Sequence, residues 1–204
     1  METLGSILVI AGAYFLGAIP WGVVLGRTIK GIDPRKHGSG GTGATNSFRL
    51  LGAPIAISVF ILDFAKGLLP VVLARSLDLP NWAIALTAIV PAIGHCWSPF
   101  IGLKGGKGMA TGGGAACGLL PWLALLLLPM ILVVYLTRYV SVASLGATII
   151  GPAIVIVMAL IGDFSGWWAA AVTAIALLIV YQHRANIHRL LNGTENKFGN
   201  RVAT

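Results

Sequence analysis

Apolar runs and short polar segments alternate along this chain. Five apolar runs predict membrane-spanning helices, because each approaches the roughly 20 residues that cross a bilayer. They cover residues 4–26, 54–74, 81–97, 142–161 and 167–181. A sixth run, residues 109–136, spans about 28 residues and has room for one long helix or for two short ones.

The polar segments carry helix signals of their own. Residues 44–52, after a basic loop, predict a short helix that Gly52 ends, and residues 184–191 of the polar tail suit a short interfacial helix that ends at Asn192 and Gly193. The first apolar run follows no basic residues and contains no obvious cleavage site. We therefore expect it to be retained as a helix.

Composition agrees with a membrane protein. The 204 residues are 57% hydrophobic and only 10% charged, with a mean hydropathy of +0.90, whereas soluble domains are about 25% charged. The net charge of +8 is scattered between the apolar runs and forms no basic recognition module, so we expect no nucleic-acid partner. The two cysteines, Cys96 and Cys117, lie in or beside apolar segments and are expected to be free thiols. The sequence predicts one all-helical membrane domain over residues 1–204.

Basic residues predict how the chain crosses the membrane, because loops rich in Lys and Arg stay in the cytoplasm. These residues are Arg27, Lys30, Arg35, Lys36 and Arg49 in the first loop, Lys104 and Lys107 in the second, and Arg184, Arg189, Lys197 and Arg201 in the tail. An even number of crossings must separate the second loop from the tail. A break of the long run near residues 118–121 satisfies this and gives seven crossings, with Arg138 inside and Asp78 and Asp163 outside. The N-terminus is then outside and the C-terminus cytoplasmic.

Three polar segments are thereby placed at one face: residues 38–49, 94–111 and 183–196. The first contains GSGGTG, which matches the G-x-G-x-x-G dinucleotide pattern but follows no strand, so a dinucleotide site is disfavoured. A glycine-rich turn that opens a helix still suits an oxyanion. Hydroxyl, amide and guanidinium groups for such a site are offered by Ser39, Thr42, Thr45, Asn46 and Arg49. The alternative is a flexible loop whose Arg49 only marks topology.

The second segment, GHCWSPFIGLKGGKGMAT, has two lysines and four glycines within residues 102–108. Glycines allow backbone N–H groups to converge, and a helix that begins near Gly108 adds its positive end, so the segment predicts a phosphate cradle. It is not a Walker A motif, because Gly108 follows Lys107 where Ser or Thr is required. A catalytic and a structural role for His95 are equally compatible with the pattern.

The third segment places His183 and Asn186 three residues apart on one helical face, where both side chains can point at one site. The alternative is a basic tail that lies on the membrane. Asp63 and Lys66, also three residues apart, lie inside the second apolar run. Charges at that depth are costly, and we favour a structural ion pair beneath the site over direct catalysis.

These three segments, taken together and in order, resemble the motifs of one family, the bacterial membrane glycerol-3-phosphate acyltransferases that use acyl phosphate (the PlsY family). The matching motifs are GSGGTGATNSFR, GHCWSPFIGLKGGKGMAT and HRANIHRLLNGTEN. The resemblance covers essentially the whole chain. It departs from the family at Gly41, where Asn is more common, and at Leu103, where an aromatic residue is usual.

The resemblance implies transfer of a fatty acyl group from acyl phosphate to the 1-hydroxyl of sn-glycerol 3-phosphate, the first acylation of bacterial phospholipid synthesis, in a bacterial inner membrane. It implies catalytic roles for Ser39, His183 and Asn186. Phosphate-binding roles fall on Gly40, Asn46, Arg49, Lys104, Gly105, Gly106, Lys107 and Gly108. Supporting roles fall on Asp63, Lys66, His95 and Glu195. We expect no cofactor, no metal and no obligate protein partner.

Two questions stay open from the sequence. No side chain is an obvious general base, so either a substrate phosphate accepts the hydroxyl proton or His183 does. A small anion transporter also fits several spans with basic loops, although the apolar runs contain few charges beyond Asp63 and Lys66.

Overall fold

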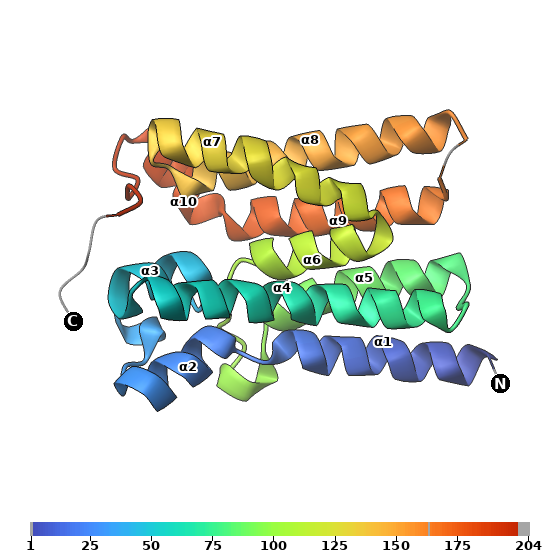
Figure 1. Cartoon of the computed structure of the whole chain (residues 1–204), viewed down its shortest axis with the longest axis horizontal. Helices are drawn as coiled ribbons and strands as arrows, with labels where there is room; N and C mark the ends of the chain where they lie inside the picture. The colour runs from blue at the N-terminus through green and yellow to red at the C-terminus, as the bar shows by residue number, and fades with distance from the viewer. Residues whose placement is uncertain (1, 163, 200–204) are drawn as a thin grey trace.

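The fold was examined in a computed structural model, which describes residues 2–162 and 164–199. Every regular element of these described residues is a helix. The long helices run side by side along the longest axis of the molecule, and the start of α1 lies at the end of that axis opposite to α2, α3 and α10 (Figure 1). The predicted all-helical fold is confirmed.

The elements follow one another without a strand between them in the described chain. The α-helices are α1 (Glu2–Ala18), α2 (Trp21–Lys30), α3 (Ala44–Leu51), α4 (Ala53–Ser76), α5 (Asn81–Cys96), α6 (Met109–Leu119), α7 (Leu127–Thr137), α8 (Val140–Leu160), α9 (Gly166–Gln182) and α10 (Arg184–Leu191). Short 3-10 helices are η1 (Pro34–Lys36), η2 (Pro99–Ile101) and η3 (Pro121–Leu126).

Helix length and apolar character indicate which segments could cross a membrane. Among the described residues, four segments are long and apolar enough to span a bilayer: Thr3–Lys30, Ala53–Ser76, Asn81–Ile101 and Val140–Leu160. The pair α9 and α10, bent by 56°, makes a fifth if it is one span. Helices α6 and α7 are shorter. The seven crossings and their orientation therefore stay predictions, and two residues used in that argument, Asp163 and Arg201, lie outside the described residues.

The first predicted span, residues 4–26, lies within the candidate span Thr3–Lys30, but its helix is broken into α1 and α2. Proline has no N–H and clashes with the preceding turn, so Pro20 interrupts the helix. Beside the break, the Ile19 carbonyl oxygen accepts hydrogen bonds from the Trp21 N–H at 3.1 Å and from the Lys66 ammonium at 2.7 Å. Helix α2 also extends to Lys30, beyond the predicted end at Gly26.

The 28-residue run is broken where the sequence predicts, between α6 and η3. Leu120 adopts extended backbone and Pro121 begins η3. The guanidinium of Arg75 on α4 donates to the oxygens of Gly118 and Leu119 at 2.7 and 3.1 Å. These bonds satisfy carbonyl groups that the end of α6 leaves unpaired, which is necessary in apolar surroundings.

Helices α4 and α6 approach each other through glycines. A Cβ on Gly114 would overlap the Phe64 carbonyl oxygen, and a Cβ on Gly67 would overlap that of Thr111. Backbone therefore lies against backbone, the small-residue packing typical of membrane helices. This contact fixes the start of α6, and with it Gly108, relative to α4.

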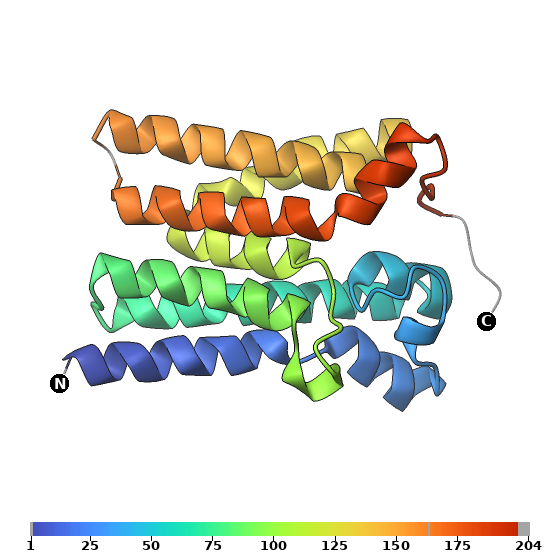
Figure 2. The same cartoon turned by 180° about the vertical axis from the view of Figure 1, so that it is seen from behind.

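The polar segments gather at one end of the helix bundle. Helices α2, α3 and α10 lie at the end where the described chain finishes, opposite to the start of α1 (Figures 1 and 2). Figure 2 also shows the loop between α5 and α6 bending toward α1 and α2. Three segments that are far apart in the sequence thus lie in the same part of the bundle.

The close packing of α4 on α6 yields a test. We expect Gly114→Ala to destabilise the protein by about 1–3 kcal/mol, because the added methyl must push two helix backbones apart. Gly113→Ala is the matched control, since its Cβ would meet nothing within 4 Å, and it should be neutral or slightly stabilising. Thermal unfolding in detergent compares the two, and equal losses would contradict the packing argument.

Candidate active site

A polar cavity of about 210 Å³ lies where the three segments meet. Its lining comes from the loop before α3, from α3 itself, from the start of α6, from α8 and from the tail. The predicted site residues among the lining are Ser39, Asn46, Arg49, Asp63, His95, Gly106, Lys107, Gly108, His183, Asn186 and Glu195. The structure thus brings together residues that lie more than 150 positions apart.

The carboxylate of Glu195 organises one wall of this cavity. Its Oε1 accepts hydrogen bonds from Asn186 Nδ2 at 2.6 Å and from Ser141 Oγ at 2.9 Å, and its Oε2 pairs with Arg189 Nε at 2.8 Å. Burial raises the pKa of the Glu195 carboxyl, but these three contacts outweigh burial, and the pKa lies below its usual value. Glu195 is therefore ionised and holds three side chains in place.

Lys107 contacts the same network through Asn186, to whose Oδ1 it donates a hydrogen bond. Asn186 is 4% exposed and bridges an ammonium and a carboxylate. Its amide oxygen faces Lys107, and its amide nitrogen faces Glu195. Burial lowers the pKa of Lys107 to about 8; Glu195 raises this pKa, and Arg189 and Arg49 lower it. The ammonium is charged at neutral pH, but it loses its proton within a mildly alkaline range.

Arg49 supplies the second predicted cation. One terminal nitrogen donates to the Asn196 carbonyl oxygen at 3.3 Å, while Nε is buried without a partner. Burial lowers the pKa of the guanidinium, but arginine stays charged. A buried charged donor without an acceptor is costly, which suits a site that receives an anion.

His183, 3% exposed, is held in one orientation at the junction of α9 and α10. Its Nδ1 donates to the Ile179 carbonyl oxygen at 2.8 Å, which leaves Nε2 to accept a hydrogen bond when the ring is neutral. Ser39, in contrast, is exposed on the loop before α3, at the rim of the cavity. Both residues are placed to contact a polar substrate.

The predicted phosphate-binding role of Asn46 is not supported by its contacts. Its Nδ2 donates to the carbonyl oxygens of Pro34, His37 and Gly41 at 2.9 to 3.3 Å, and its Oδ1 accepts from the Ser39 N–H at 3.0 Å. The amide is occupied by loop backbone. Asn46 therefore shapes the glycine-rich loop and positions Ser39.

The predicted cradle of glycine N–H groups needs correction. The Gly105 and Gly106 N–H groups donate to the carbonyl oxygens of Cys96 and His95 at 3.0 and 3.1 Å, so these donors are already used. A Cβ at Gly106 would overlap the His95 ring, which explains glycine there by close approach. Anion donors at this wall are instead Lys107 and the first N–H groups of α6.

Three predicted phosphate ligands do not line the cavity: Gly40, Lys104 and Gly105. The Lys104 side chain is exposed, and the Gly40 N–H donates to the His37 carbonyl oxygen at 3.1 Å. Gly40 has a φ of 70°, a left-handed conformation that favours glycine. Turn geometry accounts for Gly40, and the structure shows no contact of Lys104 with the cavity.

Asp63 and Lys66 form the predicted buried ion pair, with 2.7 Å between Nζ and Oδ1. Lys66 also caps the broken helix at Ile19, so its ammonium is fixed from two sides. His95 Nδ1 lies 3.6 Å from the same Asp63 oxygen. Asp63 and His95 border the cavity floor, and Lys66 lies behind them.

Among the cavity residues that sequence reasoning missed are Ser141 and Arg189, whose side chains contact Glu195. In the sequence Arg189 serves only as a topology signal, and Ser141 falls between the apolar runs 109–136 and 142–161. The partners of the Glu195 carboxylate lie 6 to 54 positions away from it in the chain, so the contacts leave no local pattern in the sequence. One available signal was the spacing of His183, Asn186 and Arg189 at every third residue, which places them on one side of the tail helix.

The comparisons identify a family. A family model described as Glycerol-3-phosphate acyltransferase matches residues 7–193. The chain is 42% identical to the glycerol-3-phosphate acyltransferase of Fusobacterium nucleatum subsp. nucleatum, over 91% of this chain and 94% of that protein. A relative with the same description from Synechococcus sp. (strain CC9902) is 43% identical over 96% of both chains.

Solved structures are also similar over nearly the whole chain. The crystal structure of PlsY (YgiH), an integral membrane glycerol 3-phosphate acyltransferase, in its glycerol 3-phosphate form, matches with a TM-score of 0.88 and 38% identity, covering 96% of both chains. Its lysophosphatidic acid form matches with a TM-score of 0.85 and 37% identity, again covering 96% of both chains.

The charge state of Lys107 yields a pH prediction. The charge of sulfate does not change between pH 7 and pH 9. Any change in sulfate affinity over that range therefore reflects a change in the charge of the protein. With the Lys107 pKa lowered to about 8, the charged fraction falls about tenfold from pH 7 to pH 9, and sulfate affinity should fall by up to the same factor. Calorimetry measures it, and Lys107→Arg should remove the pH dependence. An equal fall in both proteins would assign the titration to another group.

Proposed function

Because the chain belongs to the glycerol-3-phosphate acyltransferase family, we propose that it transfers a fatty acyl group from acyl phosphate to the 1-hydroxyl of sn-glycerol 3-phosphate. The new bond joins the acyl carbon to the hydroxyl oxygen, and the carbon–oxygen bond to phosphate breaks. The products are lysophosphatidate and inorganic phosphate, and the hydroxyl proton leaves on phosphate. Acyltransferase activity follows from the family; the donor, the mechanism and the residue roles are our proposal.

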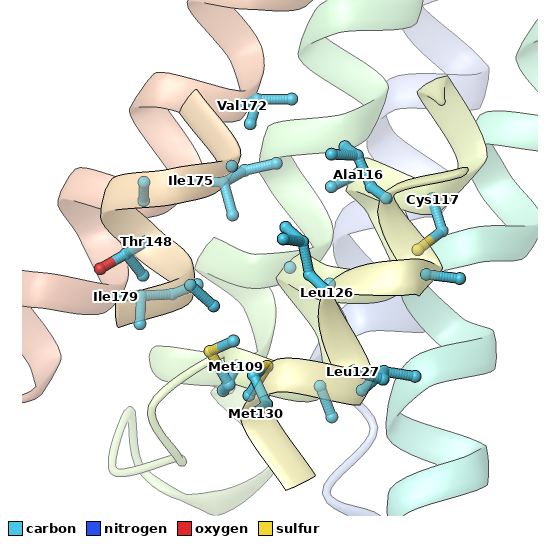
Figure 3. Close-up of a pocket in the computed structure, with 18 of the residues that line it drawn as sticks. Met109, Ala116, Cys117, Leu126, Leu127, Met130, Thr148, Val172, Ile175 and Ile179 are labelled. Carbon is cyan, nitrogen blue, oxygen red and sulfur yellow. The ribbon is translucent and has the colours of Figure 1, made fainter. Parts of the chain in front are cut away.

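The observation that carries the proposal is that an apolar pocket joins the polar cavity. This pocket, of about 110 Å³, lies among α4, α6, α7, α8 and α9. Its labelled lining side chains are almost all hydrocarbon or thioether groups, with Thr148 as the polar exception (Figure 3). The two spaces share Phe60, Met109, Ala110 and Met130. A molecule with an acyl chain and an anionic head would fit across this junction.

The junction also suggests where each phosphate binds. An acyl phosphate with its chain in the apolar pocket would place its head near Met109 and Ala110, at the start of α6. There the helix N-terminus and Lys107 favour a negative charge. The phosphate of glycerol 3-phosphate would then bind farther from the pocket, at Arg49 and Ser39.

The positive charge of the cavity lining supports the proposal that two phosphate groups bind there. The lining contains the cations Arg49, Lys107 and Arg189, and Glu195 neutralises part of their charge. The other lining carboxylate, Asp63, is paired with Lys66. The surplus of positive charge suits the developing negative charge on the acyl oxygen and on the departing phosphate.

An acyl phosphate is already activated, so the reaction needs no covalent acyl-enzyme. Both cysteines are buried, and the described hydrogen bond of His183 goes to a backbone oxygen and not to a serine hydroxyl. We propose that a donor phosphate oxygen accepts the hydroxyl proton, while Ser39, His183 and Asn186 orient the acceptor. Positioning and charge stabilisation then supply most of the rate.

We also propose that the protein lies in a bacterial inner membrane, with the cavity open to the cytoplasm where glycerol 3-phosphate is found. The basic loops support this orientation by the positive-inside rule. The surrounding lipids would contact the many apolar side chains that the helices expose.

The central test uses purified protein with palmitoyl phosphate and glycerol 3-phosphate. We expect lysophosphatidate and inorganic phosphate in equal amounts. Palmitoyl-coenzyme A in place of palmitoyl phosphate should give no product. Product from the thioester alone would overturn the proposed donor, and absence of product from either donor would leave anion transport as the better reading.

His183→Ala separates the two proton acceptors. If His183 orients the acceptor, kcat should fall about 10- to 100-fold, the KM for glycerol 3-phosphate should rise, and the shape of the kcat–pH profile should not change. His188→Ala, an exposed histidine on the same helix, is the matched control. A loss near a thousandfold in kcat with an unchanged KM would instead identify His183 as the general base.

A further inference from the structure

The end of the third motif and the residues after it contribute to the lining of the polar cavity and pack beside it. Residues 195–198, here called the C-terminal strap, run from Glu195 on one wall to Phe198 beside α3. Two of its members, Glu195 and Asn196, line the cavity. The strap therefore belongs to the site and is more than a polar tail.

Phe198 fixes the end of the strap to two separate parts of the fold. Its ring stacks on Phe48 of α3, with the ring centroids 4.6 Å apart and the planes 27° apart. Its backbone N–H donates to the Arg138 oxygen at 2.6 Å, and its carbonyl oxygen accepts from Arg138 Nε and a terminal nitrogen at 3.1 and 2.9 Å. Phe198 thus ties α3 to the connection between α7 and α8.

Between its two fixed ends, the strap makes one contact with a cation of the site. The Asn196 carbonyl oxygen accepts a hydrogen bond from a terminal nitrogen of Arg49 at 3.3 Å. Arg49 follows Phe48 directly in α3, so the ring stack and this bond act on neighbouring residues. The Nε of Arg49 is left buried and unpartnered beside the cavity.

Arginine has a long side chain, and ordering it on binding has an entropic cost. A guanidinium already held at one terminal nitrogen presents its remaining donors at a fixed angle, which favours a phosphate oxygen. The strap supplies that hold through a backbone oxygen, whose position depends on where Phe198 is anchored.

We propose that Phe198 is a positioning residue: by anchoring the C-terminal strap on Phe48 and Arg138, it holds Arg49 ready to bind the phosphate of glycerol 3-phosphate. This inference rests on the proposed function, because it assigns that phosphate to Arg49. Phe198 itself lines neither the polar cavity nor the apolar pocket.

The test is Phe198→Ala, assayed with both substrates. The KM for glycerol 3-phosphate should rise about tenfold, while kcat and the KM for palmitoyl phosphate stay within about twofold. Phe198→Tyr, which keeps the ring, should restore the wild-type KM. Phe100→Ala, the same truncation at an exposed loop position, is the matched control and should behave as wild type.

A double-mutant cycle tests whether Phe198 acts through Arg49. In an Arg49→Lys background, which keeps the charge but loses the forked donor group, Phe198→Ala should change the KM for glycerol 3-phosphate by less than twofold. An equal tenfold effect in both backgrounds would overturn the inference. So would a fall in kcat alone, since that is the result expected from general damage to the fold.

Failure of the proposed function gives a different result. If wild type forms no product, the same variants are compared by calorimetric binding of glycerol 3-phosphate. A tenfold weaker Kd in Phe198→Ala, absent in the Arg49→Lys background, would uphold the positioning role without the reaction. An unchanged Kd would refute it.

Discussion

The backbone contact between α4 and α6 is the constraint on which the site depends. Gly67 and Gly114 allow the two helices to lie closer than any side chain would permit. The start of α6 is thereby held against the part of α4 that carries Asp63 and Lys66. Because α6 is only 11 residues long and is closed at its other end by Arg75, it has little freedom to shift. Its positive end therefore faces a fixed position in the cavity.

An apolar core and a few buried polar contacts together hold the helices in place. The helices bury a core in which alanine and glycine allow close packing, and the buried ion pair of Asp63 with Lys66 borders the cavity through Asp63. Lys66 also donates to the Ile19 carbonyl oxygen beside the Pro20 break. At the cavity wall, Glu195 joins α8 and α10 through its two oxygens. One buried cation and one buried anion thus connect elements that apolar packing alone would leave free to rotate.

Local patterns could be read from the sequence because each depends on neighbouring residues. Apolar runs located the long helices, the break near Leu120 followed from charge parity, and three residues of spacing identified the pair of Asp63 and Lys66. Roles that depend on distant contacts could not be read. The sequence suggested that Asn46 binds phosphate, because a free amide beside a glycine-rich turn could do so. Its four contacts with loop backbone form only in the folded loop and leave no trace in the local sequence.

In the glycine-rich second segment, three predicted phosphate-binding residues line the cavity, but two of the glycine N–H groups expected to bind an anion are already used by loop backbone. Glycines permit N–H groups to converge on an anion, but they permit equally a loop that packs against backbone, and Gly105 and Gly106 do the latter. Composition cannot distinguish these uses, because both need the same absence of a Cβ. Lys104 and Lys107 were likewise indistinguishable, although only Lys107 reaches the cavity.

Burial of Lys107 has two opposing effects on anion binding. Removing water from around the ammonium strengthens its attraction to a phosphate, and the same loss of water lowers its pKa to about 8. Asn186 limits the second effect by accepting a hydrogen bond from the ammonium, and Glu195 orients Asn186 for that contact. The acidic residue of a cation-rich site therefore does not weaken it. Glu195 keeps the Lys107 ammonium charged and oriented. A lysine or arginine in place of Glu195 would repel that ammonium.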